Sequence, residues 1–270
     1  MCFLVEGQRI EPGYVVERLL GEGAFAEVYR VRHRFMGRQA MKVFKQAGSG
    51  ALMTEAVLLT RIAHPNIVRV FDAGTVATAF GERGFFTMEY VAGGTLYRLW
   101  ATPRNRPIAV AETVRIIHQV SRGLAAAHAE RPPIIHLDIT PHNILIGPDG
   151  RARLGDFGLA KVARPLPGKA RGQVTLAFAA PESMLGAVAE SCAMDVWSLG
   201  AIAYLLLTDR HPYPEGASRR TRPVAPSALN SDADTRLDDI VLAALDPNPV
   251  GRTPNATVLA GQLADWGAGL

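Results

Sequence analysis

The sequence predicts an α+β fold with two lobes, a small β-rich lobe followed by a larger and mostly α-helical one. Three observations support this prediction. Up to about residue 90, β-branched and aromatic residues alternate with polar ones and are interrupted by glycines. After Gly93, apolar residues recur at helical spacing instead. The stretch YVAGG at 90–94 separates the two patterns, so we expect an N-terminal lobe over 1–91 and a C-terminal lobe over 92–270.

The first lobe is expected to be a sheet interrupted by one main helix. Apolar residues recur at helical spacing from Leu52 to Ala63, and the turn HPN at 64–66 closes this pattern. Alternating apolar and polar positions predict the strands at 11–23, 26–35, 37–44, 67–74 and 84–90.

The second lobe is expected to be built from helices at 110–130, 194–208, 236–245 and 256–266. The segment 194–208 is apolar almost all round, which indicates a buried helix. Its apolar run is far shorter than the roughly 20 residues of a membrane span. Two short strands are expected at Ile134–Ile135 and at 144–146. Residues 214–236 lack helical spacing.

Composition excludes several classes of protein. Of 270 residues, 48% are hydrophobic and 20% charged, which is ordinary for a globular chain with a large core. The two cysteines, Cys2 and Cys192, have no paired spacing and disfavour a disulfide framework or a zinc site. The net charge of +4 comes from scattered bases, so we expect no nucleic-acid partner. The first ten residues do not resemble a signal peptide, so we expect a cytoplasmic location.

A glycine-containing loop, GEGAFAEV at 21–28, lies between two predicted strands. Glycines there allow backbone N–H groups to approach a phosphate, and Phe25 could cap the loop. The alternative is a tight hairpin without a ligand. The candidate phosphate-binding residues of this loop are Gly21, Glu22, Gly23, Ala24 and Phe25.

Lys42 lies in the predicted strand QAMKVF, among apolar neighbours. A lysine that points inward there requires an anion. Glu55 is the sole carboxylate between Lys42 and Asp72, and it lies on the predicted helix. A Lys–Glu pair that holds nucleotide phosphates is therefore one interpretation; a solvated lysine on an edge strand is the other.

A polar string, HLDITPHN at 136–143, lies between the two short apolar runs. The Asp138 carboxylate could accept a proton from an attacking hydroxyl, and the Asn143 amide oxygen could bind a hard cation such as Mg²⁺. Asp156 in RLGDFGLA offers a second carboxylate. Taken singly, each aspartate is more simply explained as a turn residue.

Taken together in chain order, these motifs resemble the eukaryotic-like protein kinase family in its bacterial serine/threonine branch. The resemblance extends from about Tyr14 to Leu263. Its elements are GEGAFAEV, QAMK, Glu55, MEYVAGG, HLDITPHN, DFG, APE at 180–182, DVWSLG at 195–200 and Arg252 in NPVGRTP.

The resemblance implies a bilobal kinase fold, with ATP and Mg²⁺ or Mn²⁺ as cofactors. The glycine loop would cover the phosphates, and Lys42, oriented by Glu55, would hold them. Asn143 and Asp156 would bind the metal, and Asp138 would accept the substrate proton. The adenine pocket would comprise Val28, Ala40, Met88, Glu89, Val91 and Leu145. The resemblance also implies structural roles for an ion pair between Glu182 and Arg252 and for a buried Asp195.

The sequence departs from the family pattern at several positions. Leu137 stands where most members carry arginine, and Thr140 replaces the lysine that is directed at the γ-phosphate. The run 157–174 contains no serine, threonine or tyrosine, but it contains four basic residues and no acid. We therefore expect activity that does not depend on phosphorylation of this segment, and a protein substrate or partner with an acidic surface. The substrate-docking helix of the family is expected to be short or absent in 214–236.

The leading hypothesis is thus a protein kinase that transfers the γ-phosphate of ATP to Ser or Thr, a preference supported by Thr175. One alternative is a pseudokinase scaffold that binds nucleotide and a partner, which the changes at Leu137 and Thr140 leave open. Another is a small-molecule kinase, which the intact APE and DVWSLG motifs disfavour. The sequence indicates neither a membrane partner nor an oligomeric state.

Overall fold

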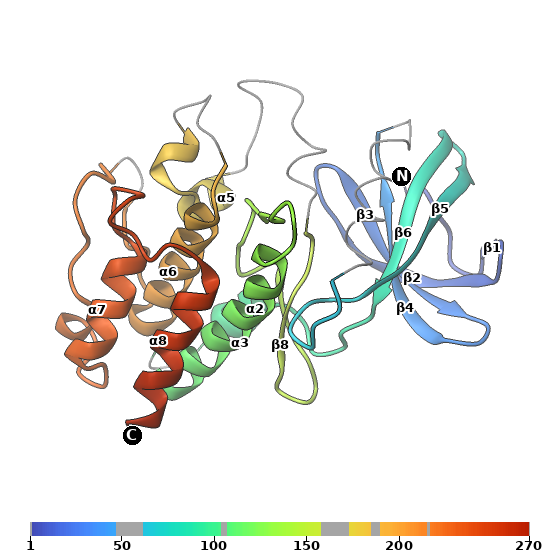
Figure 1. Ribbon diagram of the computed structural model, residues 1–270. Coiled ribbons are helices and arrows are strands. Elements are labelled where there is room, and N and C mark those ends of the chain that lie inside the picture. Colours follow the sequence, from blue (N-terminus) through green and yellow to red (C-terminus); the bar gives the residue numbers. More distant parts are fainter. Residues whose placement is uncertain are drawn as a thin grey trace. The chain divides into compact units, whose positions relative to one another are not determined.

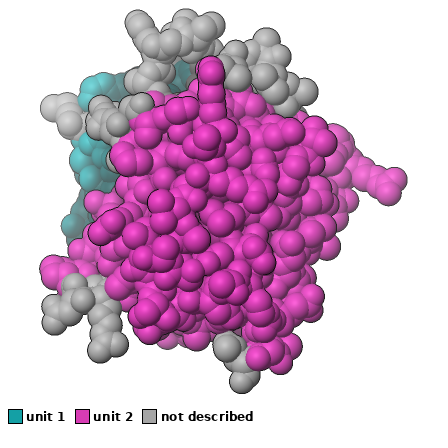
Figure 2. Space-filling view, turned by 90° about the vertical axis from the view of Figure 1, so that its left-hand side faces the viewer, with its two compact units in different colours: residues 1–63, 68–92, 161–163 teal, residues 64–67, 93–160, 164–270 magenta. Residues whose placement is uncertain are grey.

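The computed structural model describes residues 2–46, 62–103, 107–157, 173–184, 190–214 and 217–269. The chain divides into two compact units (Figure 2). Unit 1 comprises residues 1–63, 68–92 and 161–163, and unit 2 comprises residues 64–67, 93–160 and 164–270. Residues 47–61, which include Glu55 and most of the helix predicted from Leu52 to Ala63, lie outside the described residues.

Unit 1 is built on a six-stranded sheet in the order β1-β2-β3-β4-β6-β5, with every neighbouring pair antiparallel (Figure 1). Its strands are β1 (Arg9–Ile10), β2 (Tyr14–Glu22), β3 (Ala26–His33), β4 (Gly37–Phe44), β5 (Val70–Thr78) and β6 (Gly81–Glu89). The five predicted strands are confirmed, and β1 was not predicted. β5 begins at Val70 rather than at Ile67, because Ile67 instead forms an isolated bridge with Leu154 in unit 2.

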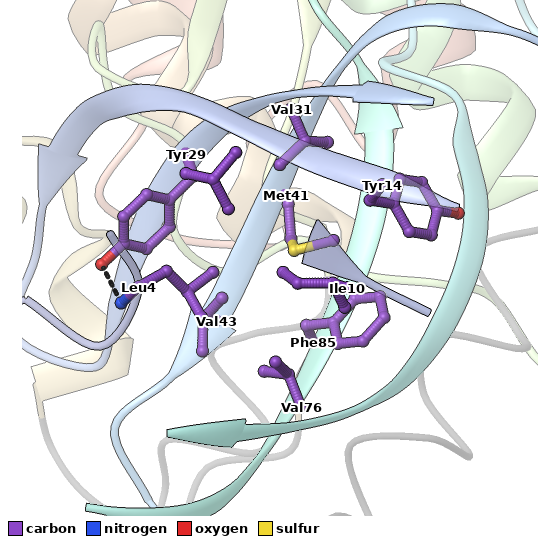
Figure 3. Close-up of a cluster of buried hydrophobic side chains, with 10 residues drawn as sticks. Leu4, Ile10, Tyr14, Tyr29, Val31, Met41, Val43, Val76 and Phe85 are labelled. Atoms are coloured by element: carbon purple, nitrogen blue, oxygen red, sulfur yellow. Dashed lines mark hydrogen bonds between the residues drawn. The ribbon is translucent and has the colours of Figure 1, made fainter. Parts of the chain in front are cut away.

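One face of this sheet forms the hydrophobic core of unit 1 (Figure 3). Side chains that alternate along the strands share this face, as Met41 and Val43 do on β4. The N-terminal segment covers part of it, because the Tyr29 hydroxyl accepts the Leu4 N–H at 3.1 Å and donates to the Glu27 carboxylate. Burial, followed by the bond to Glu27, raises the pKa of Tyr29. The buried cluster comprises Leu4, Ile10, Tyr14, Val16, Tyr29, Val31, Met41, Val43, Val76 and Phe85.

Unit 2 is mostly helical (Figure 1). Helix α3 packs against α8 and α6, and α6 packs against α7. Every residue of α6 from Ala193 to Thr208 is buried, which confirms the predicted buried helix. In the part of the chain that the structure describes, no helix is long and apolar enough to cross a membrane. The helices are α2 (Leu96–Ala101), α3 (Val110–His128), α5 (Gln173–Phe178), α6 (Cys192–Thr208), α7 (Thr235–Ala244) and α8 (Ala256–Ala268).

The strand predicted at Ile134–Ile135 is wrong. The Ile134 N–H bonds the Ala127 carbonyl near the end of α3 at 3.0 Å, and the His136 and Leu137 N–H groups bond the Asp195 side chain. These bonds take the place of a strand ladder. The strand predicted at 144–146 is confirmed as β7 (Ile144–Ile146), whose antiparallel partner is β8 (Ala152–Leu154).

The region between α6 and α7 contains no α-helix in its described residues, 209–214 and 217–234. One short 3₁₀ turn, η2 (Pro226–Ala228), lies within it. A second, η1 (Pro181–Met184), follows α5. The expectation of a reduced docking helix agrees with this arrangement, as far as the described residues extend.

Gly93 allows the chain entering α2 to contact β7 closely. A Cβ atom at this position would lie 2.0 Å from the Ile146 carbonyl oxygen, which is backbone and cannot rotate away. We expect Gly93→Ala to lower the free energy of unfolding by roughly 1–3 kcal/mol, because the backbone must shift to relieve the overlap. Urea denaturation followed by circular dichroism measures the effect.

Gly261 in α8 supplies the control, since a Cβ there meets no atom within 4 Å. Gly261→Ala should stabilise the protein by about 0.5–1 kcal/mol, the usual gain from alanine in a helix. Equal effects of the two substitutions would contradict the close contact at Gly93.

Candidate active site

The polar string 136–143 is an irregular loop of unit 2, which we call the catalytic loop. Its first half is anchored to Asp195, a carboxylate on α6 that is 0% exposed. Oδ2 of Asp195 accepts the His136 N–H at 2.8 Å, and Oδ1 accepts the Leu137 N–H at 2.7 Å. Two backbone donors of this irregular segment are therefore satisfied by a buried carboxylate.

His136 and His128 complete this network, and their hydrogen-bond partners assign the donor and acceptor nitrogens of each ring. The His136 Nδ1 accepts the Asp138 N–H at 3.3 Å, so its Nε2–H donates to the Gly155 carbonyl at 2.8 Å. The His128 Nδ1 accepts the Ala256 N–H at 3.4 Å, so its Nε2–H donates to Asp195 at 3.0 Å. The catalytic loop is thereby linked to α3, α6 and the start of α8.

Leu137 has φ 64°, a left-handed conformation that costs a leucine roughly 1–2 kcal/mol. The bond from its N–H to Asp195 helps to hold it there. The chain bends at this residue, between the buried His136 and the partly exposed Asp138. Thr140 is 5% exposed, and its carbonyl accepts the Asn143 N–H at 3.0 Å.

Asn143 lies at the end of the catalytic loop, directly before β7. Its Nδ2 donates to the Asp138 carbonyl at 2.7 Å and lies 3.4 Å from the Asp138 carboxylate. Because both contacts use the amide nitrogen, the network assigns the amide oxygen to the side away from Asp138. That oxygen is the atom with which a hard cation would be bound.

Asp156 follows β8 and has φ 58°. The preceding Gly155 N–H bonds the Asn143 carbonyl at 2.8 Å, so the two segments that carry the predicted metal ligands are hydrogen-bonded to each other. The following residue, Phe157, is buried and its ring lies 4.7 Å from that of His136. An amide oxygen and a carboxylate are ligands suited to Mg²⁺ or Mn²⁺, so the donor set fits the predicted ion.

Glu182 and Arg252 form a buried bidentate ion pair, at 2.7 and 3.0 Å. The guanidinium also donates to the carbonyls of Ala193 and Asp246, and it lies over the ring of Trp197 at 4.9 Å. The predicted pairing is therefore present. It connects η1 with the loop before α8 and with the start of α6.

In unit 1, the sheet register places the predicted nucleotide-binding side chains on one face. Val28 is directly opposite Lys42, and Ala40 is directly opposite Met88. Directly paired residues point to the same side of a sheet, and Ala40 and Lys42 are two apart on β4. This face is opposite to the one that carries Met41 and Val43 in the hydrophobic core. Lys42 itself is 7% exposed.

The glycine loop joins β2 to β3 as a hairpin in which the Gly23 N–H bonds the Ala26 carbonyl at 2.8 Å. Gly21 and Glu22 end β2, Ala24 is exposed, and the Phe25 side chain at the tip is 57% exposed. Glu22 pairs at 2.5 Å with Lys45, the residue that follows β4. Further along, the Glu89 N–H bonds the Arg69 carbonyl at 2.8 Å, and Val91 is partly exposed.

Leu145 lies in β7 opposite Arg153 and also forms a bridge with Thr95. Residues 158–172, and hence most of the hydroxyl-free segment, lie outside the described residues, as do Glu55 and the side chain of Thr175.

A model of the protein kinase domain matches residues 14–241 of the chain. The chain belongs to the protein kinase family. A probable serine/threonine-protein kinase of Clostridium acetobutylicum is 29% identical over 93% of the chain and 39% of its own length. Serine/threonine-protein kinase PknB of Mycolicibacterium smegmatis is 30% identical over 95% and 43%, and PknL of Mycobacterium tuberculosis is 30% identical over 96% and 67%. All three relatives bear the name of serine/threonine-protein kinases.

The chain spans about two-fifths of the length of the first two of these relatives. In the described part of this domain, no group of three or more His, Cys, Asp or Glu side chains could hold a metal ion.

Sequence patterns did not identify Tyr97, which contacts the catalytic loop, or Arg219, which contacts the end of α5. Tyr97 on α2 stacks its ring on that of His142 in the catalytic loop, with centroids 4.1 Å apart. Burial lowers the pKa of His142.

Arg219 donates to the carbonyls of Leu176 and Ala179 at the end of α5, the first at 2.7 Å. An aromatic beside a helix N-cap was the available signal for Tyr97; Arg219 had none.

Proposed function

We propose that this protein kinase domain transfers the γ-phosphate of ATP to serine or threonine hydroxyls of protein substrates. The observation that supports this best is the arrangement of Asp138 and Asn143. A carboxylate and an oriented amide lie side by side in a loop whose backbone is fixed by the buried Asp195.

In this proposal, Asp138 accepts the proton of the substrate hydroxyl. The hydroxyl oxygen then forms the new bond to the γ-phosphorus, and the bond from phosphorus to the leaving oxygen of ADP breaks. Asn143 and Asp156 hold Mg²⁺ or Mn²⁺, which neutralises charge on the phosphates when bound. Thr140 occupies the family position of a lysine, so one cation directed at the γ-phosphate is missing.

The proposed nucleotide contacts are divided between an N-lobe over 1–91 and a C-lobe over 92–270. In the N-lobe, Val28, Ala40 and Met88 contact adenine, and Glu89 and Val91 offer it backbone groups. Lys42, oriented by Glu55, binds the phosphates beneath the loop 21–25. Leu145 contributes the adenine contact of the C-lobe. Shared orientation of Val28, Ala40, Lys42 and Met88 on one sheet face supports this assignment.

The direct test is transfer of labelled γ-phosphate from ATP and Mg²⁺ to a generic protein substrate, followed by identification of the phosphorylated residue by mass spectrometry. Phosphoserine or phosphothreonine is expected. ATP binding without any transfer would favour the second candidate, a pseudokinase that binds nucleotide and a protein partner. The absence of cationic side chains at Leu137 and Thr140 is the observation in its favour.

The proposed clamp predicts that Lys42→Met and Glu55→Gln do not act independently. Each substitution should lower kcat/KM, and the double variant should lose clearly less than the sum of the two losses in free energy, because one residue orients the other. Initial-rate kinetics on the four proteins measure the coupling. Additive losses would exclude Glu55 as the partner of Lys42.

We further propose that activity does not require phosphorylation of the segment 157–174. That segment has no hydroxyl side chain, and Leu137 replaces the arginine that binds a phosphate on this segment in other members of the family. Its bases, Lys161, Arg164, Lys169 and Arg171, have no acid among them, so an acidic surface on a substrate or partner would complement them.

We expect phosphatase-treated kinase to reach its full initial rate without a lag. Mass spectrometry should first establish that the protein carries no phosphate. A lag that ends as phosphate accumulates on residues 157–175 would contradict this form of regulation.

A further inference from the structure

The second half of the catalytic loop is held differently from the first. Within the loop, the His136 and Leu137 N–H groups bond Asp195, whereas the Asn143 N–H bonds back to Thr140. Among the described residues, α2 contacts this half at Pro141 and His142, and the Gly155 N–H bonds it at Asn143. The orientation of Asn143 therefore depends on elements other than α6.

Tyr97 of helix α2 contacts the loop in two ways. Its N–H donates to the Pro141 carbonyl at 2.9 Å. This N–H is one of the first-turn donors that have no partner within a helix, and Thr95 caps a different one, that of Arg98. The Tyr97 ring stacks on His142 with an interplanar angle of 21°. Both contacts are made to the two residues directly before Asn143.

The α2 helix is itself anchored at both ends. At its start, the Ile146 N–H bonds the Gly94 carbonyl at 2.8 Å, and Thr95 forms a bridge with Leu145, so α2 is tied to β7. Near its end, the Trp100 Nε1–H donates to Asp209 at 3.0 Å; Asp209 is the left-handed C-cap of α6 with φ 53°. The buried Leu96 lies between these anchors. A helix of six residues is thereby fixed against displacement.

We propose that α2 acts as a positioning element for the catalytic loop, with Tyr97 as its positioning residue for Asn143. This inference rests on the function proposed above, because it assigns Asn143 to metal binding. The bond to Pro141 fixes the path of the loop backbone before Asn143, and the stack on His142 fixes the orientation of that backbone. The Asn143 amide nitrogen can then bond Asp138, while the amide oxygen faces the ion. A misplacement of about 1 Å in such a group can reduce a rate by roughly a hundredfold.

Four variants separate positioning from simple stabilisation. Tyr97→Leu removes the stack, and Tyr97→Phe keeps the ring. His142→Ala removes the same stack from the other side without changing α2, which keeps the test valid if Tyr97→Leu does not fold. Trp100→Phe removes the N–H to Asp209 and keeps an aromatic ring on α2. It therefore measures how much kcat and melting temperature fall when the helix loses its anchor at the end far from the loop.

The measurements are melting temperature, kcat, the Mg²⁺ concentration that gives half the maximal rate, and calorimetric affinity for a non-hydrolysable ATP analogue with and without Mg²⁺. We expect Tyr97→Leu and His142→Ala to lower kcat about tenfold and to raise the Mg²⁺ requirement several-fold. Affinity for the analogue should fall only when Mg²⁺ is present. Tyr97→Phe should behave as the unaltered protein, and the Tyr97→Leu/His142→Ala double variant should be no worse than the poorer single.

Two results would overturn the inference. One is a loss of kcat in Tyr97→Leu that matches that of Trp100→Phe at equal loss of melting temperature. The other is an unchanged effect of Mg²⁺ on analogue affinity in both stack variants. If the unaltered protein binds the analogue and transfers no phosphate, the proposed function fails, and the calorimetric comparison still decides the role of Tyr97.

Discussion

Asp138→Asn is expected to reduce phosphate transfer by roughly 10²–10⁴-fold, the usual contribution of a positioned general base. An amide cannot accept the substrate proton, but it has nearly the shape of the carboxylate. Asn143 bonds the Asp138 backbone carbonyl at 2.7 Å, a contact that the substitution does not remove. We therefore expect the melting temperature and the affinity for ATP to change little. Single-turnover kinetics and calorimetry measure the two quantities separately.

Asp232→Asn is the matched control, because this aspartate is exposed and lies before α7, outside the site. The same chemical change there should leave transfer unaltered. If Asp138→Asn keeps more than about a tenth of the rate, its loss is below the range of a general base, and Asp138 is not the proton acceptor.

Arg252→Met should lower the free energy of unfolding by about 3–5 kcal/mol. The guanidinium is fully buried, and removing it leaves the Glu182 carboxylate without its bidentate partner and two carbonyls without one of their donors. The melting temperature should fall by roughly 10 °C. Thermal and urea denaturation measure the loss, and phosphate transfer per folded molecule should change much less.

Arg222→Met is the exposed counterpart, since Arg222 pairs with Asp246 at 2.5 Å but its side chain is 54% exposed. This substitution should lower the free energy of unfolding by about 1 kcal/mol or less. The double variant Glu182→Leu/Arg252→Met should recover part of the stability that Arg252→Met loses, because it leaves no buried charge unpaired. Equal costs for Arg222→Met and Arg252→Met would show that burial does not set the strength of these pairs.

The sequence predicted best those features that depend on neighbours in the chain. Strands β2 to β4 alternate regularly, and α3 and α6 carry long apolar patterns, so their positions could be predicted to within a few residues. Helices α2 and α5 have six residues each, too few for a periodic pattern to be recognised. The strand expected at Ile134–Ile135 failed because the nearby N–H groups bond to Asp195, an acceptor some sixty residues later.

The same distinction between local and long-range features applies to the candidate site. Asp138, Asn143 and Asp156 could be proposed from the sequence because their motifs are contiguous, and the ion pair of Glu182 with Arg252 was expected from the family resemblance. The contact of Tyr97 with His142 was missed, because it joins residues 45 positions apart that have no shared motif. Local patterns identify reacting groups, and the residues that orient those groups depend on tertiary packing.

The carboxylate of Asp195 also has a consequence for the order in which this domain is assembled on the ribosome. The catalytic loop is synthesised well before its anchor at 195, and the anchor's own partner, His128, accepts an N–H from Ala256. A nascent chain that ends before α8 thus has the whole loop but lacks part of the network that fixes it. Contacts of such long sequence separation form late. The loop proposed to carry the phosphate-transfer chemistry should therefore be one of the last parts of the domain to acquire its final conformation during synthesis.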